Sequence, residues 1–149
     1  MTADPDVVLM SIRSPHVERI LDGTKTVELR RRALRLELGT TVLVYAAATR
    51  RELVGAFDIG GIDAATPERL WRRHRTATGI TKAEFSQYFD SAPIAYAVTA
   101  TRVRELPEPI PLEELRRRWP DFTAPQTHRR VTANELTHLL NGERQILIP

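Results

Sequence analysis

Apolar and polar positions alternate along several short stretches of the chain, and this pattern predicts β-strands. The predicted strands cover residues 7–13, 24–32, 41–48, 52–62 and 94–106, with a last short strand at 146–148. Gly55 and the pair Gly60 and Gly61 indicate a bulge or bend within the fourth of them. The proline cluster at 107–111 is expected to end the fifth.

Amphipathic stretches with recognisable starts predict helices between these strands. The predicted helices cover residues 14–23, 66–75, 81–89, 112–119 and 132–142. Ser14 is the expected N-cap of the first helix. The pairs Thr81–Glu84 and Thr132–Glu135 have the spacing of capping boxes, and Gly142 is expected to end the last helix.

The order of these elements indicates the fold class. Strands and helices do not alternate regularly, which argues against a doubly wound α/β sheet. We therefore predict a mixed α+β domain built round a curved sheet or barrel. At 149 residues, with no repeat, low-complexity tract or interdomain linker, the chain suits one domain spanning residues 1–149.

Composition narrows the class of protein further. The chain is 42% hydrophobic and 28% charged, which is typical of a globular domain. No apolar run approaches the roughly 20 residues that span a bilayer, so no membrane partner is expected. The absence of cysteine excludes disulfides and thiol catalysis. Because the N-terminal residues also lack the profile of a secretory signal, we expect a cytoplasmic protein.

The basic residues are strongly biased toward arginine. Of 22 basic residues only Lys25 and Lys82 are lysines, although the net charge is just +3. The planar guanidinium of arginine suits phosphates and base edges. A GC-rich genome explains the same bias without any function. Composition therefore permits an anionic partner without requiring one.

The second predicted strand carries unusually many charges. Alternation places Glu28, Arg30 and Arg32 on one face and directs Val27 and Leu29 toward the core. Two arginines on one pleat repel each other unless an anion lies beside them. Glu28 is able to pair with one of them, which leaves the other for a phosphate or a base edge. A solvated strand edge explains the pattern equally well.

Gly23, Lys25, Glu28 and Arg30 form the pattern G-x-K-x-x-E-x-R, which resembles the signature of ASCH domains, a branch of the PUA-like superfamily. The flanking strand–helix–strand segment and the loop APQTHRR are similar to those of short bacterial ASCH proteins. The resemblance covers residues 8–131. It implies a PUA-like β-barrel of about five to six mixed strands with surrounding helices, and a cleft lined by the signature strand.

The resemblance also implies a function. Members of the wider superfamily bind RNA or modified nucleobases in such clefts, some ASCH relatives resemble ribonucleases, and others are amidohydrolases that deacetylate a modified cytidine. This chain departs from the amidohydrolases, because Glu28 stands where they carry a threonine nucleophile. It also carries His128 where the subgroup loop usually has an aromatic residue.

Nine residues are candidates for binding nucleic acid, from the motif and from segments expected beside it. They are Ser11, Arg13, Lys25, Glu28, Arg30, Arg32, Tyr45, Gln126 and Arg129. Ser11 and Arg13 share a face that lines the cleft if the first two strands pair. Tyr45 is suited to stacking on a base, and Gln126 to reading a base edge. A core tyrosine and an ordinary connecting loop explain the last two residues equally well.

These observations predict that the protein binds single-stranded nucleic acid, RNA more than DNA, or a modified nucleobase, in a basic cleft. The alternative is a metal-independent ribonuclease with Lys25, Glu28 and His128 as catalytic residues, or less favourably an amidohydrolase. A module that recognises another anion or a protein is a third class. We expect no cofactor and no metal site, because the histidines have no carboxylate or cysteine at ligand spacing.

Overall fold

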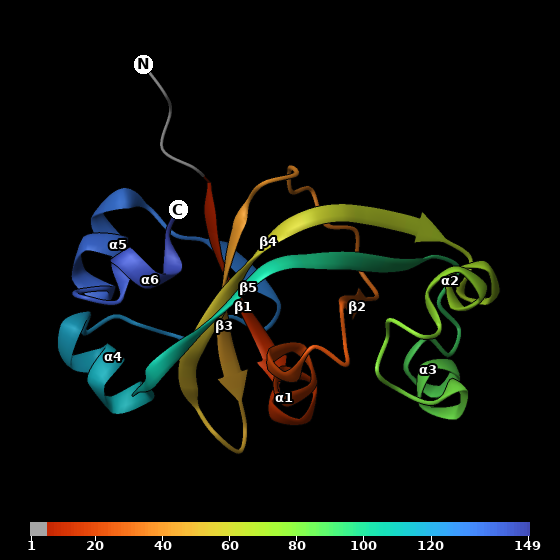
Figure 1. The fold of residues 1–149 in the computed structure, drawn as a ribbon, viewed down its shortest axis with the longest axis horizontal. Coiled ribbons are helices and arrows are strands. Elements are labelled where there is room, and N and C mark those ends of the chain that lie inside the picture. Colours follow the sequence, from red (N-terminus) through yellow and green to blue (C-terminus); the bar gives the residue numbers. More distant parts are fainter. Residues whose placement is uncertain (1–5) are drawn as a thin grey trace.

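A six-stranded mixed sheet curls through the molecule as a half-barrel in the computed structural model, which describes residues 6–149 (Figure 1). The strands are β1 (Val7–Arg13), β2 (Val27–Arg30), β3 (Thr41–Ala47), β4 (Glu52–Ala65), β5 (Ala95–Pro111) and β6 (His128–Arg130). Their order is β2-β5-β4-β3-β1-β6. β1 runs parallel to β3, and the other neighbouring pairs are antiparallel. The predicted α+β class with a curved sheet is confirmed.

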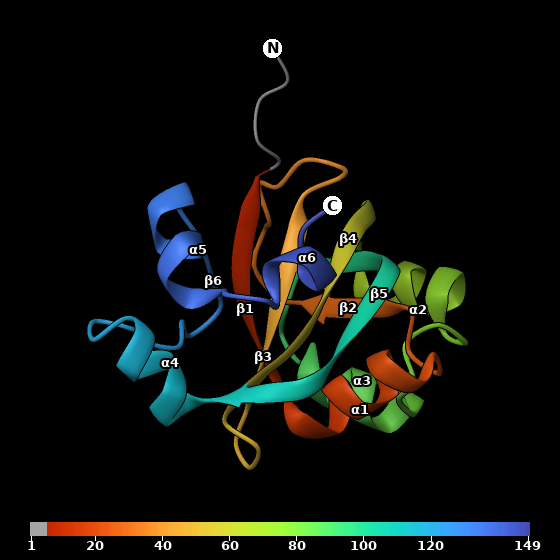
Figure 2. The same ribbon diagram turned by 60° about the vertical axis from the view of Figure 1, so that its left-hand side comes forward.

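Six helices of the described chain surround this sheet. They are α1 (Ser14–Asp22), α2 (Pro67–His74), α3 (Lys82–Tyr88), α4 (Leu112–Arg118), α5 (Ala133–Leu139) and α6 (Arg144–Leu147). α2 and α3 lie together at one end of the molecule, and α4, α5 and α6 gather at the other (Figure 1). After a 60° turn, α1 and α3 are seen on the same side (Figure 2). None of the helices in residues 6–149 is long and apolar enough to cross a membrane.

The sheet is buried on both faces, which explains why its central strands read as continuous apolar runs. In β1, Leu9 packs into a core cluster with the C-terminal helices, whereas Val8 and Met10 pack into a second cluster with α1. Successive side chains of a strand point to opposite faces. A third cluster joins Leu29 of β2 to Phe85 of α3 and fixes that helix beside the strand.

Most of the predicted local signals are confirmed. Both capping boxes, Thr81–Glu84 and Thr132–Glu135, form at the starts of α3 and α5. The expected cap of α1 is wrong, because Arg13 occupies the N-cap position and the Ser14 hydroxyl donates instead to the carbonyl oxygen of Ala47 at 2.6 Å. This bond ties the start of α1 to β3.

Glycines and prolines mark irregularities between β4 and β5. The register shifts next to Gly55 and Gly61, as the sequence predicted. The expectation that the proline cluster ends β5 is wrong. Paired positions jump from Glu105 to Ile110, so residues 106–109 form a bulge in which a proline costs no ladder hydrogen bond. β5 therefore continues to Pro111.

Other predicted bounds also differ from the structure. β2 ends at Arg30 rather than at residue 32. α5 ends at Leu139, before the expected stop at Gly142. The expected strand at 146–148 is wrong as well, because the amides of residues 146 and 147 bond back to the carbonyl of Glu143 and form α6.

Candidate functional site

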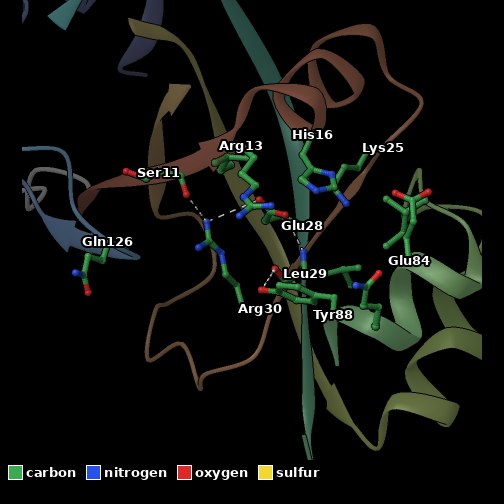
Figure 3. Close-up of a pocket in the computed structure, with 13 residues that line it drawn as sticks. Ser11, Arg13, His16, Lys25, Glu28, Leu29, Arg30, Glu84, Tyr88 and Gln126 are labelled. Carbon is green, nitrogen blue, oxygen red and sulfur yellow. Dashed lines mark hydrogen bonds and ion pairs between the residues drawn. The ribbon is translucent and has the colours of Figure 1, made fainter. Parts of the chain in front are cut away.

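A cleft of about 550 Å³ lies where β1 and β2 face each other without pairing (Figure 3). Its walls come from the end of β1, the first turn of α1, β2 and one side of α3, with Gln126 at the edge. The volume falls within the range of roughly 300–1,000 Å³ that is usual for ligand sites. The half-barrel therefore leaves its opening at the charged signature strand.

The two strands beside the cleft are held by a side chain instead of a ladder. β1 pairs with β3 and β6, and β2 pairs with β5, so the pairing considered for the first two strands does not form. Arg30 spans the gap, because its Nη2 donates to the carbonyl oxygen of Ser11 at 3.1 Å. Ser11 and Arg13 reach the cleft in this arrangement and line it.

Lys25 lies at the floor of the cleft, in the segment between α1 and β2. Its side chain is almost wholly inaccessible, at 1% relative exposure, and its Nζ donates to the carbonyl oxygen of Thr78 at 2.7 Å. Burial lowers the pKa of Lys25, and Glu28 opposes that effect. The backbone at Gly79 packs against the lysine stem, where an added Cβ would lie 2.9 Å from the Lys25 Cβ. The Lys25 ammonium is thus poorly solvated and has the carbonyl oxygen of Thr78 as its neutral partner.

Glu28 and Arg30 lie on the same side of β2, as the alternation predicted. The Oε2 of Glu28 lies 3.7 Å from the Nη2 of Arg30, and its Oε1 accepts from the backbone N–H of Leu29 at 3.0 Å. The Nε of Arg30 is buried and has no hydrogen-bond partner among the described residues. A buried donor without a partner is costly, so a ligand acceptor at this position would be favourable.

His16 also lines the cleft, although the sequence analysis did not single it out. Burial is the main cause that lowers its pKa, and the neighbouring charge of Lys25 acts in the same direction. Its Nδ1 is buried without a partner in the described part of the chain. The sequence could have indicated His16, because the predicted helix starts directly after Arg13. Its first turn, which contains His16, must therefore lie beside the cleft that Arg13 lines.

The wall opposite β1 comes from α3 and was also missed. Glu84, Gln87 and Tyr88 line the cleft, and their spacing of three and four residues places them on one face of the helix (Figure 3). The Tyr88 hydroxyl donates to the carbonyl oxygen of Leu29 at 3.3 Å, and burial raises the pKa of Tyr88. An aromatic ring is thus present beside the signature strand.

Three of the nucleic-acid-binding candidates do not line the cleft. Tyr45 is 3% exposed and packs in the core against Phe122, in the cluster shared with the C-terminal helices. Arg32 lies beyond the end of β2, exposed to solvent. Arg129 forms an ion pair with Glu135 of α5 at 2.8 Å. The loop that precedes β6 contributes Gln126 to the cleft instead.

His128 lies in β6 opposite Met10 and is not among the cleft-lining residues. Its pKa is lowered, mainly by burial and also by the charge of Arg30. The structure brings Lys25 and Glu28 to one site and leaves His128 outside its lining. His16 takes the place in the cleft that the sequence analysis considered for His128.

The cleft contains charges of both signs. Arg13, Lys25 and Arg30 contribute positive charge, and Glu28 and Glu84 contribute negative charge. Within residues 6–149, no group of three His, Cys, Asp or Glu side chains is placed to hold a metal ion. The arrangement suits a ligand that combines an anionic group with a polar, planar one.

Comparison with known proteins decides the family. The family model described as ASCH domain matches residues 10–109. This chain belongs to the ASCH domain family. A curated relative from Zymomonas mobilis, named "ASCH domain-containing ribonuclease", is 25% identical over 148 residues, which cover 98% of this chain and 99% of the relative.

Solved structures agree with the ASCH fold. The crystal structure of ASCH from Zymomonas mobilis superposes with a TM-score of 0.83 at 23% identity, covering 89% of this chain and 92% of that one. The N-terminal domain of McrB from Staphylothermus marinus gives a TM-score of 0.60 at 9% identity, over 92% of this chain and 94% of that one. At these identities the likeness shows the fold alone.

A second curated relative is much longer than this chain. ATP synthase subunit alpha from Ureaplasma parvum serovar 3 is 27% identical over 107 residues, which are 71% of this chain and only 13% of that protein. The chain therefore spans a small part of this relative and nearly the full length of the Zymomonas mobilis one.

Proposed function

We propose that this ASCH domain binds single-stranded nucleic acid, RNA in preference to DNA, in the cleft between β1, β2 and α3. The observation that carries the proposal is the meeting of Arg13, Lys25 and Arg30 in one concave site, with the Nε of Arg30 left without a partner. Positive side chains that converge on a concave surface favour phosphate. An arginine fork with a free donor favours a phosphate or a base edge over a spherical anion.

The polar and aromatic side chains of the cleft suit a nucleobase. Glu28 presents a carboxylate that accepts from an exocyclic amino group, and Gln126 at the edge is able to donate and accept. Tyr88 lies beside them and offers a ring for stacking, which contributes roughly 1–3 kcal/mol per base in single-strand binding. A single-stranded nucleotide provides both the phosphate and the accessible base edge that such a site needs.

The preference for RNA rests on the rim formed by α3. Glu84 and Gln87 line the cleft from exposed positions. A 2′-hydroxyl both donates and accepts a hydrogen bond, and a carboxylate or an amide on the rim is able to use it. DNA lacks that group, so the same rim would add nothing to the affinity for DNA.

Titrating end-labelled single-stranded RNA into the protein, and DNA of the same sequence in parallel, tests this proposal by fluorescence anisotropy. We expect RNA to bind more tightly than DNA, and Arg30→Glu to weaken binding at least roughly tenfold, because the change reverses a charge in the site. Equal affinity for the two polymers would remove the preference for RNA. Unchanged binding by Arg30→Glu would remove the cleft as the site.

The second candidate function is a metal-independent ribonuclease. It is favoured by the neighbouring Lys25, Glu28 and His16, and by the name of the Zymomonas mobilis relative. A neutral His16 is able to accept the proton of a 2′-hydroxyl while that oxygen attacks the adjacent phosphorus. The bond from phosphorus to the 5′-oxygen then breaks, and this oxygen takes a proton from water, which leaves a 2′,3′-cyclic phosphate and a 5′-hydroxyl. Lys25 would stabilise the charge on the phosphoryl oxygens.

Incubating RNA with the protein in EDTA separates cleavage from binding. The ribonuclease produces fragments that end in a 2′,3′-cyclic phosphate, and His16→Gln stops their release while RNA still binds. Intact RNA under conditions of full binding would end this candidate. Amidohydrolase chemistry is not favoured, because Glu28 occupies the position at which those relatives carry a threonine nucleophile.

A further inference from the structure

We infer that this ASCH domain has a second nucleotide subsite, between α2 and α3, and that one RNA strand crosses α3 to occupy both sites. The inference rests on the proposed function and specifies its substrate as an oligonucleotide rather than a single nucleotide. A hollow of about 350 Å³ lies on the side of α3 away from the cleft, lined by Trp71 and Arg72 of α2 and by Lys82 of α3. Figure 1 shows the two helices side by side.

α3 is the common wall of the two sites. Glu84, Gln87 and Tyr88 face the cleft, whereas Lys82, Phe85, Ser86 and Phe89 face the hollow. Helical periodicity produces this division, because residues three and four apart share a face. The outer surface of the helix between the two sets carries Ala83, which is small and exposed. A strand that leaves the cleft over Gln87 therefore meets the hollow next.

A row of aromatic rings connects the two sites. The ring of Tyr88 contacts Phe89 with centroids 4.7 Å apart, Phe89 contacts Phe85 at 4.7 Å, and Phe85 contacts Trp71 at 5.0 Å. The two phenylalanines are buried, and the two end members of the row are partly accessible. Tyr88 lines the cleft and Trp71 lines the hollow, so each site has one ring on which a base can stack.

The charged side chains of the hollow are suited to binding a nucleotide. Arg72 and Lys82 are exposed and are able to bind phosphate, and Glu68 and Asp90 also line the hollow and are able to accept from a base amino group. A free inorganic anion would gain nothing from the two carboxylates or the indole ring. A strand already bound in the cleft reaches this second site at a high effective concentration, which raises its affinity without a further association step.

Tryptophan fluorescence provides a direct readout of the second site. The chain has two tryptophans, and Trp119 packs against His138 near α5, at the end of the molecule away from α2. In a Trp119→Phe background, Trp71 becomes the sole tryptophan. RNA oligonucleotides from one nucleotide to about eight, within the site sizes of single-strand-binding domains, would be titrated and followed by both anisotropy and tryptophan emission.

We expect short oligonucleotides to bind without changing the emission of Trp71, and longer ones to quench it and to bind roughly fivefold tighter or more. Trp71→Leu should remove this gain and leave the binding of the shortest RNA unchanged. Arg72→Glu should have the same effect, whereas the matched control Arg69→Glu, on the same helix but outside both linings, should not. Circular dichroism checks that each variant is folded.

The outcomes separate the two proposals. If RNA binds but Trp71 emission and the affinity gain do not depend on length, the second subsite is wrong and the cleft remains the binding site. If Trp71→Leu and wild type bind long RNA equally, the second subsite is wrong as well. If no RNA of any length binds, the proposed function fails and this inference fails with it.

Discussion

Arg30 donates a 3.1 Å hydrogen bond from its Nη2 to the backbone carbonyl oxygen of Ser11, and so joins two strands that share no ladder. The same guanidinium lies 3.7 Å from Glu28 and leaves its Nε without a partner in the described chain. Arg30 thus has a structural role at the opening of the half-barrel and keeps one donor that the described residues leave unsatisfied.

Replacing Arg30 by lysine separates its charge from its geometry. Lysine keeps the positive charge but cannot bond to Ser11 and a ligand through a planar fork. We expect Arg30→Lys to weaken RNA binding by about 1–2 kcal/mol, or roughly fivefold to thirtyfold. Arg32 lies outside the cleft, so the matched variant Arg32→Lys should bind RNA with the affinity of the wild type. An Arg30→Lys variant that binds RNA as tightly as the wild type, measured by anisotropy, would show that the positive charge suffices without the planar fork.

The buried Lys25 makes stability depend on pH in the alkaline range. Burial lowers its pKa below the ordinary value of 10.5, so between those two values the unfolded chain binds more protons than the folded one. The free energy of unfolding should therefore rise with pH in that window. Lys25→Met should remove the rise.

Urea unfolding at a series of pH values from neutral to about 10 measures this effect. Lys82, the second of the chain's two lysines, is exposed, so Lys82→Met should retain the pH dependence of the wild type. A wild-type stability that stays flat or falls as the pH rises toward 10.5 would contradict the buried, destabilised ammonium.

We expect His16 to make RNA binding depend on pH in the acid range. Its pKa lies below 6.5, chiefly through burial and then through the charges of Lys25 and Arg19, with Glu28 and Glu84 acting in the opposite direction. An RNA phosphate would favour the protonated form. Affinity should therefore increase as the pH falls from 6.5 through the pKa of His16, with a proton taken up on binding.

The free energy of unfolding should decrease as the pH falls over the same window, because His16 has the higher pKa in the unfolded chain, which therefore binds the proton at a higher pH. Isothermal calorimetry in buffers of different ionisation enthalpy counts the protons taken up on binding. His16→Gln should abolish that uptake. The control is His128→Gln, because His128 is half-buried and does not line the cleft, and this variant should largely preserve the uptake. Uptake that persists undiminished in His16→Gln would show that another group titrates.

The two capping boxes provide a matched pair of variants. Thr81→Ala and Thr132→Ala each remove an N-cap hydroxyl and should lower the free energy of unfolding by about 1 kcal/mol. α3 carries the Tyr88 wall, so only Thr81→Ala should also weaken RNA binding. Denaturation curves and anisotropy on the same samples check both effects. If Thr81→Ala and Thr132→Ala weaken RNA binding equally, the cause would be a loss of overall stability and not the position of α3.

The sequence predicted the fold class and much of the signature strand because these depend on local patterns. Two-residue alternation placed Glu28 and Arg30 on one side of β2, and the capping boxes gave the starts of two helices. Glycine spacing gave the bulges in β4. Each of these signals involves residues that are close together in the chain.

The opposite wall of the cleft depends on packing between distant segments. Nothing near Tyr88 indicates that α3 packs beside β2, since that contact comes from the apolar cluster joining Leu29 to Phe85. Tyr45 was mistaken for a cleft residue because strand periodicity alone does not show that Phe122 and the C-terminal helices cover its side chain. The register of β6, and with it the place of Arg129, is likewise set by pairing with β1.

The salt dependence of RNA binding tests the central claim most directly. Three cationic side chains line the cleft, so log affinity should fall against log salt with a slope of about −2, as expected when a single strand loses about three counterions. Arg30→Gln should reduce that slope by about 0.7. No binding at low salt, or binding that does not change with salt, would contradict an RNA site in this cleft.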